Sequence, residues 1–136
     1  MGYVYADITL RNAYDSSNYM RGTIQEPDIR QIAVTALVDT GAGTLIINEA
    51  LQHELGLNIV GEYYAVLANR EARICKCTEP VEIHWGNRHS VVDAVVLEGA
   101  DEVLLGAIPL ERMDLIVDPN KGTLIGAHGD TPIMRI

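Results

Sequence analysis

The feature that most constrains this chain is the alternation of apolar and other side chains within short segments. Residues 3–10 place an apolar residue at every second position, and residues 32–38 repeat the pattern. Successive side chains of a β-strand point to opposite faces, so this alternation predicts strands with one face in a core. Helical patterns are confined to short stretches. We therefore expect a mostly β protein.

Turn-forming residues divide the remaining chain into further short elements. Asn48 suits the N-cap of a short helix that ends at a left-handed Gly56, and residues 107–113 predict a second helix. Residues 12–30 are rich in turn residues and predict a long loop or splayed hairpin. The other expected strands are 44–47, 62–67, 73–77, 80–85, 90–97, 115–117 and 123–125, which gives one mostly β domain over residues 1–136 with two short helices.

Composition and charge argue against several classes of protein. A length of 136 residues, with 48% hydrophobic and 21% charged, suits one globular domain. The net charge of −9 disfavours nucleic acid as a partner, because ten Lys and Arg stand against nineteen acids. No stretch approaches the roughly 20 apolar residues that span a bilayer, so no membrane partner is expected. The N-terminus lacks the basic start of a secretory signal, and we expect a cytoplasmic location.

The cysteines and histidines do not predict a metal site. Cys75 and Cys77 would lie about 7 Å apart on the same side of a strand, which is awkward for a disulfide. No second Cys or His pair stands at ligand spacing, so we expect two small apolar side chains on one face. No motif supports a Ser-His-Asp or Cys-His device. The four histidines are expected to be surface or structural residues: His53, His84, His89 and His128.

The triplet Asp39-Thr40-Gly41 places a lone carboxylate directly after the apolar strand 32–38. Two interpretations are open. Asp39 caps a turn for which Gly41 supplies a positive φ, or Asp39 belongs to a site. Short triplets of this kind also arise by chance, so the sequence around Asp39 has to decide between the interpretations.

Three segments together resemble the retropepsin-like (retroviral-type, clan AA) aspartic proteases, especially their bacterial single-domain relatives. They are A-L-V-D-T-G-A at 36–42, N-E-A-L-Q-H-E-L-G-L at 48–57 and L-L-G-A-I-P-L-E-R-M-D-L-I-V-D-P at 104–119. The resemblance implies an acid-protease closed β-barrel that forms one lobe per chain. It also implies peptide hydrolysis, with a peptide or protein as the substrate.

The resemblance makes Asp39 the catalytic residue. Metal-free peptide hydrolysis needs a base for the water and an acid for the carbonyl oxygen, and two close carboxylates that share one proton supply both. The chain has no second D-T-G or D-S-G, so the partner acid is expected to be Asp39 of a second copy. No metal or organic cofactor is needed. Thr40 would tie the two loops together, Gly41 would leave room for substrate, and the amides of Gly41 and Ala42 would donate toward the carboxylates.

The segment 63–77 lies where this family carries a flap that closes over substrate. Its expected tip, A-N-R-E at 68–71, is bulky and charged, with Arg70 beside Asn69. Asn69 can adopt a left-handed φ, so the turn is feasible. Either Tyr63 or Tyr64 would serve as a flap aromatic; alternatively, both are strand residues with amphipathic packing. This flap motivates an alternative function, a dimeric binding or scaffold module that keeps the fold and cleaves nothing or only one partner.

Two further segments bear on this resemblance. Gly43 stands where the family often has a small polar residue that supports the catalytic carboxylate, and Thr44 is a possible substitute. The terminal segment 133–136 could join a dimer sheet, as could residues 3–10. An untethered tail is the other interpretation of the C-terminus.

Overall fold

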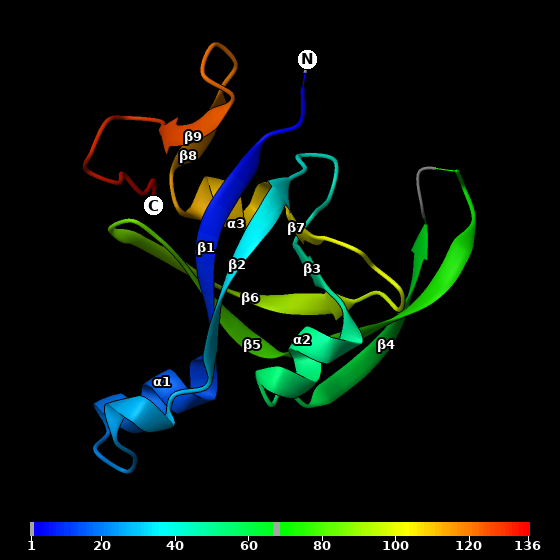
Figure 1. Ribbon diagram of the computed structural model, residues 1–136, viewed down its shortest axis with the longest axis vertical. Coiled ribbons are helices and arrows are strands. Elements are labelled where there is room, and N and C mark those ends of the chain that lie inside the picture. The colour runs from blue at the N-terminus through cyan, green and yellow to red at the C-terminus, as the bar shows by residue number, and fades with distance from the viewer. Residues whose placement is uncertain (1, 67–68) are drawn as a thin grey trace.

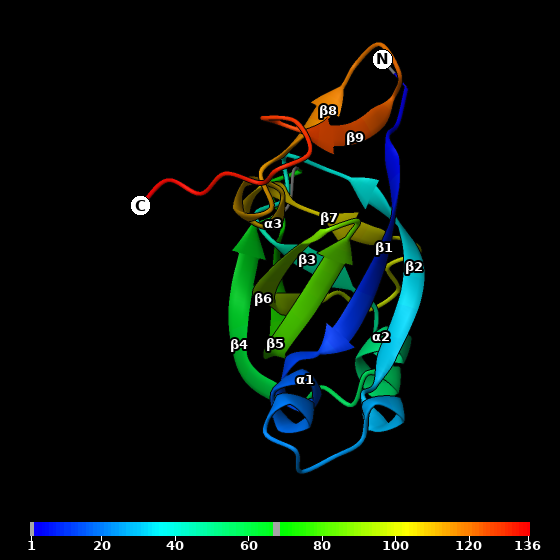
Figure 2. The same cartoon turned by 90° about the vertical axis from the view of Figure 1, so that its left-hand side faces the viewer.

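The computed structural model describes residues 2–66 and 69–136, so the parts of the expected flap that fall on Leu67 and Ala68 lie outside the described residues. Strands account for most of the regular structure (Figures 1 and 2). They are β1 (Tyr5–Asn12), β2 (Gln31–Val38), β3 (Leu45–Ile47), β4 (Ile59–Val66), β5 (Ala72–Trp85), β6 (Arg88–Val96), β7 (Val103–Leu105), β8 (Leu115–Asp118) and β9 (Thr123–Gly126).

Strand pairing closes a barrel. The large sheet has the order β1-β2-β7-β3-β6-β5-β4, and an additional pairing of β1 with β5 joins six of these strands into a ring. Closing the ring removes free edges between those strands. β4 pairs with the N-terminal half of β5, and this β4–β5 hairpin extends toward the same end of the molecule as the β2–β3 loop (Figures 1 and 2). The expected mostly β, closed-barrel fold is confirmed.

The predicted alternation determines which side chains fill the barrel. Ile8 and Leu10 of β1 are 3% and 0% exposed, and Leu45, Ile47 and Leu105 are fully buried. Each such side chain contributes roughly 1.5–3 kcal/mol by leaving water. The core is thus assembled from one face of each strand, and the other face remains available for function.

The expectation of a loop over residues 12–30 is wrong in part, because the segment contains α1 (Ala13–Met20) and a short 3-10 helix, η1 (Glu26–Asp28). With α2 (Glu49–Glu54) and α3 (Ala107–Arg112), the described residues hold three α-helices where two were expected. The turn-forming composition of α1 conceals the helix. The buried Asn12 caps it by accepting a hydrogen bond from the Asp15 N–H at 3.1 Å.

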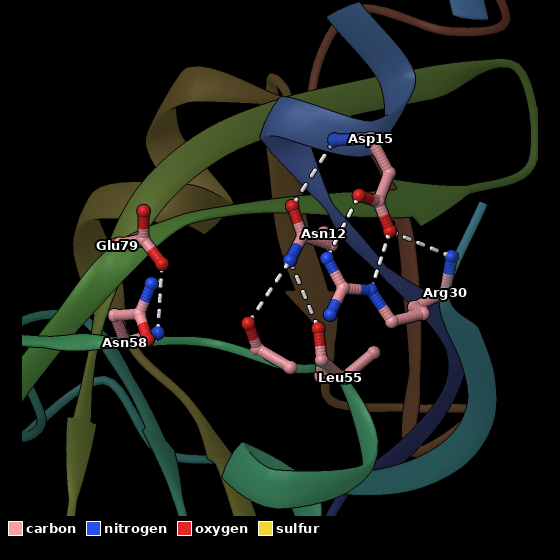
Figure 3. A network of polar contacts seen from close by, with 7 residues as sticks. Asn12, Asp15, Arg30, Leu55, Asn58 and Glu79 are labelled. Carbon is pink, nitrogen blue, oxygen red and sulfur yellow. Dashed lines mark hydrogen bonds and ion pairs between the residues drawn. The ribbon is translucent and has the colours of Figure 1, made fainter. Parts of the chain in front are cut away.

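Contacts from distant segments complete this corner of the molecule (Figure 3). The Asn12 side-chain amide donates to the Leu55 carbonyl at 2.9 Å. The backbone N–H and Nε of Arg30 both donate to Asp15 Oδ2, at 2.9 and 2.8 Å. The Arg30 side chain holds the pKa of Asp15 below its ordinary value, and the backbone bond acts in the same direction. Tertiary partners therefore stabilise a helix that its own composition does not predict.

Several local predictions are confirmed and others are corrected. Asn48 caps α2, and Gly56 follows it with φ +62°. Two expected strands over 73–85 are one strand, β5, with an irregular register between Cys77 and Pro80. The bulge keeps the chain in the sheet where Pro80 predicts a break. α3 has Pro109 within its first turn, where proline is tolerated.

The C-terminal segment is tethered as far as Met134, whose Sδ accepts from Arg112 Nη1 at 3.6 Å, and this contradicts the untethered interpretation. The buried Arg88 guanidinium donates to the carbonyls of Met113, Asp114 and Gly129. The Asp114 carboxylate accepts hydrogen bonds from His128 Nδ1 at 2.9 Å and from the Ile133 N–H at 3.1 Å. His128 first, and then the Ile133 amide, lower the pKa of Asp114. A role of residues 133–136 in a dimer sheet stays a prediction.

Within residues 2–66 and 69–136, no helix has the length and apolar character needed to cross a membrane.

Candidate active site

The loop after β2 holds Asp39 in a defined position. The Asp39 N–H donates to the Leu105 carbonyl at 3.0 Å, which continues the parallel pairing of β2 with β7 by one residue. The Gly41 N–H donates to Asp39 Oδ1 at 2.9 Å. The carboxylate is half-buried, so one of its oxygens is oriented by the loop while the side chain still reaches solvent.

The start of α3 supports this loop from behind. The Ala107 N–H donates to the Ala42 carbonyl at 2.8 Å, and the Ile108 N–H donates to the Gly43 carbonyl at 3.1 Å. A Cβ at Gly106 would come closer than 3.0 Å to the backbone of both Ala42 and Thr44. Only glycine lets the two segments approach this closely. The distant L-L-G segment of the sequence is therefore part of the Asp39 loop's architecture.

The predicted roles of the loop residues have mixed outcomes. The Gly41 amide reaches the carboxylate as expected, whereas the Ala42 amide donates to the Asp39 backbone carbonyl at 3.1 Å. Gly41 does not have a positive φ, so that part of the turn interpretation is wrong; a Cβ there would lie 3.1 Å from Asp39 Oδ1. Thr40 is exposed. The Thr44 hydroxyl donates to the Asp93 carbonyl at 2.9 Å, so it is committed away from Asp39.

A row of half-buried apolar side chains crosses the sheet beside Asp39. The register pairs Leu37 with Leu104, Leu104 with Ile46, Ile46 with Val95, and Val95 with Cys77. Paired residues share a face of the sheet, and all five are half-buried. Four of their sequence neighbours on the opposite face are completely buried, Ala36, Leu45, Ala94 and Leu105.

Asp39 lies on the same face as this row. It follows Leu37 by two residues, and its hydrogen bond to Leu105 continues the β2–β7 pairing, so the alternation of side chains extends to it. We call the row Leu37, Leu104, Ile46, Val95 and Cys77 the apolar row. Sequence reasoning missed its first four members as site residues. The alternation in each strand identifies the residues of the outer face as well as those of the buried face. The order of the strands in the sheet was needed to show that these outer residues form one surface.

The β4–β5 hairpin continues the same face beyond the barrel. Tyr63 pairs with Cys75, which lies two residues before Cys77 and is buried. Tyr64 pairs with Ile74 on the opposite face, and both are exposed. Tyr63 is thus the aromatic on the side of Asp39. At the tip, Arg70 has the left-handed φ of +67° that was expected for Asn69, whose side chain instead accepts from the Glu71 N–H at 3.0 Å.

The cysteines and most histidines have ordinary structural surroundings. Both thiols are free, and burial raises the pKa of Cys77. His84 stacks on His89 at 5.6 Å between ring centroids and contacts Glu82, and His128 contacts Asp114. In the described part of the chain, no three His, Cys, Asp or Glu side chains gather as a metal site would require.

Comparison with known proteins agrees with this geometry. The model of the family described as gag-polyprotein putative aspartyl protease matches residues 22–112, which contain the Asp39 loop, the β4–β5 hairpin and α3. The chain belongs to this aspartyl protease family. No curated protein matches the sequence.

Two solved structures are similar to the chain. The retroviral protease-like domain of Ddi1 from Leishmania major is 15% identical, with a TM-score of 0.58 over 99% of this chain and 96% of that one. A retropepsin-like aspartic protease from Rickettsia conorii is 18% identical, with a TM-score of 0.49 over 86% of this chain and 77% of that one. The similarity to the Ddi1 domain shows that this member of the aspartyl protease family has a retropepsin-like fold.

Proposed function

We propose that this protein is a homodimeric aspartic endopeptidase in which Asp39 of each copy supplies half of the active site. The proposal is supported by family membership and by the single D-T-G of the sequence. One carboxylate cannot act as base and acid in the same step. A two-fold axis beside the Asp39 loop would provide the second carboxylate without a second motif.

In this dimer a water molecule lies between the two Asp39 carboxylates. One carboxylate removes a proton from the water as it attacks the peptide carbonyl, and the other, protonated, donates to the carbonyl oxygen. As in aspartic proteases generally, two carboxylates this close cannot both ionise readily, so they share one proton and titrate as a pair. The Gly41 N–H keeps one oxygen of each Asp39 oriented.

The observation that carries the proposal is the shared face of Asp39 and the apolar row. An extended peptide laid along this face would bring its backbone to the carboxylate and its side chains onto Leu37, Ile46 and Leu104. The β4–β5 hairpin would cover the peptide and exclude water. Across the axis, the exposed Thr40 hydroxyl would bond to the partner loop.

The test is Asp39→Asn, with unfolded proteins and a peptide mixture as substrates from about pH 3 to about pH 7. Asn keeps the shape of the side chain and removes its acid–base chemistry, so we expect kcat/KM to fall by at least about 10²–10⁴. Sedimentation should find the dimer intact. Asp130→Asn is the matched control, because Asp130-Thr131 lacks the following glycine and Asp130 is exposed. Equal turnover by wild type and Asp39→Asn would exclude the proposed mechanism.

A dimeric binding or scaffold module is the second candidate. It is favoured by the flap tip, where Arg70 adopts a conformation that is uncommon for a residue with a side chain. A statine-type inhibitor distinguishes the two candidates. Binding of the inhibitor without cleavage of any substrate over the whole pH range would support the scaffold and contradict the peptidase.

A further inference from the structure

On the hairpin face that continues the apolar row, the residue of β5 nearest the tip is a cation, Arg73. In the β4–β5 hairpin, Arg73 precedes Cys75 and Cys77 at two-residue steps, so all three lie on the face that continues the apolar row. Ala65, the cross-strand partner of Arg73, is small and leaves space beside the guanidinium. A peptide that leaves the apolar row at Cys77 and turns along β5 would therefore pass Cys75 and then reach Arg73, four residues from the end of the row.

Arg73 differs from the other cation on the same strand. Lys76 lies on the opposite face and stands directly across from Glu62, a pairing of opposite charges. Arg73 is exposed, and among the described residues no carboxylate lies within 4.0 Å of its guanidinium. Its guanidinium carries five N–H donors, which can meet a carboxylate from outside the chain.

The charge balance of the chain makes this position distinctive. Residues 70–76 of the hairpin hold three of the ten Lys and Arg, Arg70, Arg73 and Lys76, against one acid, Glu71, although the chain as a whole carries a net charge of −9. The excess of acids elsewhere would repel an acidic peptide, so a cation on the face of the apolar row would favour an acidic side chain locally.

We propose that Arg73 determines substrate specificity by binding the side-chain carboxylate of a glutamate or aspartate in an extended peptide beneath the flap. The inference rests on the proposed peptidase function and adds a substrate class to it. The planar guanidinium can hold a carboxylate through two parallel hydrogen bonds, which a neutral amide of the same shape cannot match.

The experiment compares peptides that differ only by Glu, Gln or Lys at each position around a cleaved bond, at pH 6, where a glutamate is ionised. At one position, wild type is expected to cleave the Glu peptide at least about tenfold faster in kcat/KM than the Gln peptide. Arg73→Gln should reduce that ratio to within about twofold and leave the melting temperature unchanged, because the side chain is exposed. Arg73→Glu should favour the Lys peptide.

Lys76→Gln is the matched control, since it removes the same charge three residues away on the other face. It should retain the wild-type preference for Glu. A preference lost equally in Lys76→Gln and Arg73→Gln would show a general charge effect and overturn the inference. Equal cleavage of Glu and Gln peptides by wild type at every position would overturn it as well, with the peptidase function intact.

A binding measurement separates this inference from the proposed function. Asp39→Asn, which keeps the hairpin unchanged, is titrated with the same peptides by calorimetry. We expect the Glu peptide to bind about tenfold more tightly than the Gln peptide, and this difference to vanish in the double variant with Arg73→Gln. Such discrimination without any cleavage by wild type would reject the peptidase and keep Arg73 as a recognition residue. Absence of both would reject both.

Discussion

The Asp39 loop and the β4–β5 hairpin are held in opposite ways. Backbone hydrogen bonds fix the loop on two sides, from Asp39 to β7 and from Ala42 to α3. Between Lys76 and the tip, where β5 no longer pairs with β6, the hairpin relies on the pairing of its own two strands. Its aromatic side chains are largely in water, with Tyr63 64% and Tyr64 78% exposed. Catalysis by paired carboxylates requires fixed acids, and substrate entry requires a cover that moves. In the proposed peptidase, the loop would hold the acid and the hairpin would provide the cover.

Gly106→Ala should disturb the support of the Asp39 loop and give the largest loss of stability. The new Cβ would meet the backbone of Ala42 and Thr44, which cannot move without disturbing the Asp39 loop. We expect the free energy of unfolding to fall by about 3 kcal/mol or more, at the upper end of the effects of overpacking. Thermal unfolding should show a melting temperature lower by roughly 10 °C, together with loss of activity.

Gly43→Ala is the control from the same loop. A Cβ at Gly43 would have no heavy atom within 4 Å, and its φ is not positive. Its stability should stay within about 0.5 kcal/mol of wild type. If both variants lost stability equally, the close approach of α3 to the loop would not be what fixes Asp39.

Asp15→Asn should have an intermediate effect on stability. Asp15 lies in α1, at the opposite end of the molecule from the Asp39 loop (Figure 1). Asn cannot replace the charged bonds to Arg30, and because Arg30 is half-exposed we expect a loss of only about 1–2 kcal/mol, measured by urea unfolding. Activity of the remaining folded protein should not change. Glu98→Gln, at an exposed turn, is the control.

The same carboxylate predicts part of the acid sensitivity. Its pKa is lower folded than unfolded, so between those values the unfolded chain binds more protons. The stabilisation by Asp15 is complete above its ordinary pKa of about 4 and is lost as pH falls through the folded value. Wild type should therefore lose stability more steeply than Asp15→Asn below about pH 4. Parallel pH curves for the two proteins would contradict this assignment.

The smallest changes in stability are expected in the β4–β5 hairpin. Tyr63→Ala and Tyr64→Ala should each change the free energy of unfolding by no more than about 0.5 kcal/mol, because both rings are mostly exposed. Activity should separate them. Tyr63 lies on the side of Asp39 and Tyr64 on the other, so Tyr63→Ala should lower kcat/KM by about tenfold and Tyr64→Ala by less than about twofold. A larger effect of Tyr64→Ala would reverse the assignment of the hairpin's faces.

Much of the barrel could be predicted from the sequence because its strands alternate and its caps are local. Ile8, Leu10 and the Asn48 cap need only their own neighbours in sequence. α1 could not be predicted, since Asp15 and Ser16 favour turns and its stabilising partners, Arg30 and Leu55, come from other elements. The uninterrupted β5 includes a register shift against β6 between Cys77 and Pro80, and the pairing with β6 is not visible in the segment's own sequence.

At the site, the sequence by itself determined the acid, its glycine and the family, because these are fixed by adjacent residues and by segments that stand in a recognisable order. Only the tertiary structure decided which side chains share a surface with Asp39. Leu104, Val95 and Cys77 are far apart in the chain and meet through strand order and register. The structure likewise revealed that Gly106 supports the loop and that Arg73 and Lys76 point to opposite sides. Such relations are non-local, because they arise when separate strands pair and close the barrel.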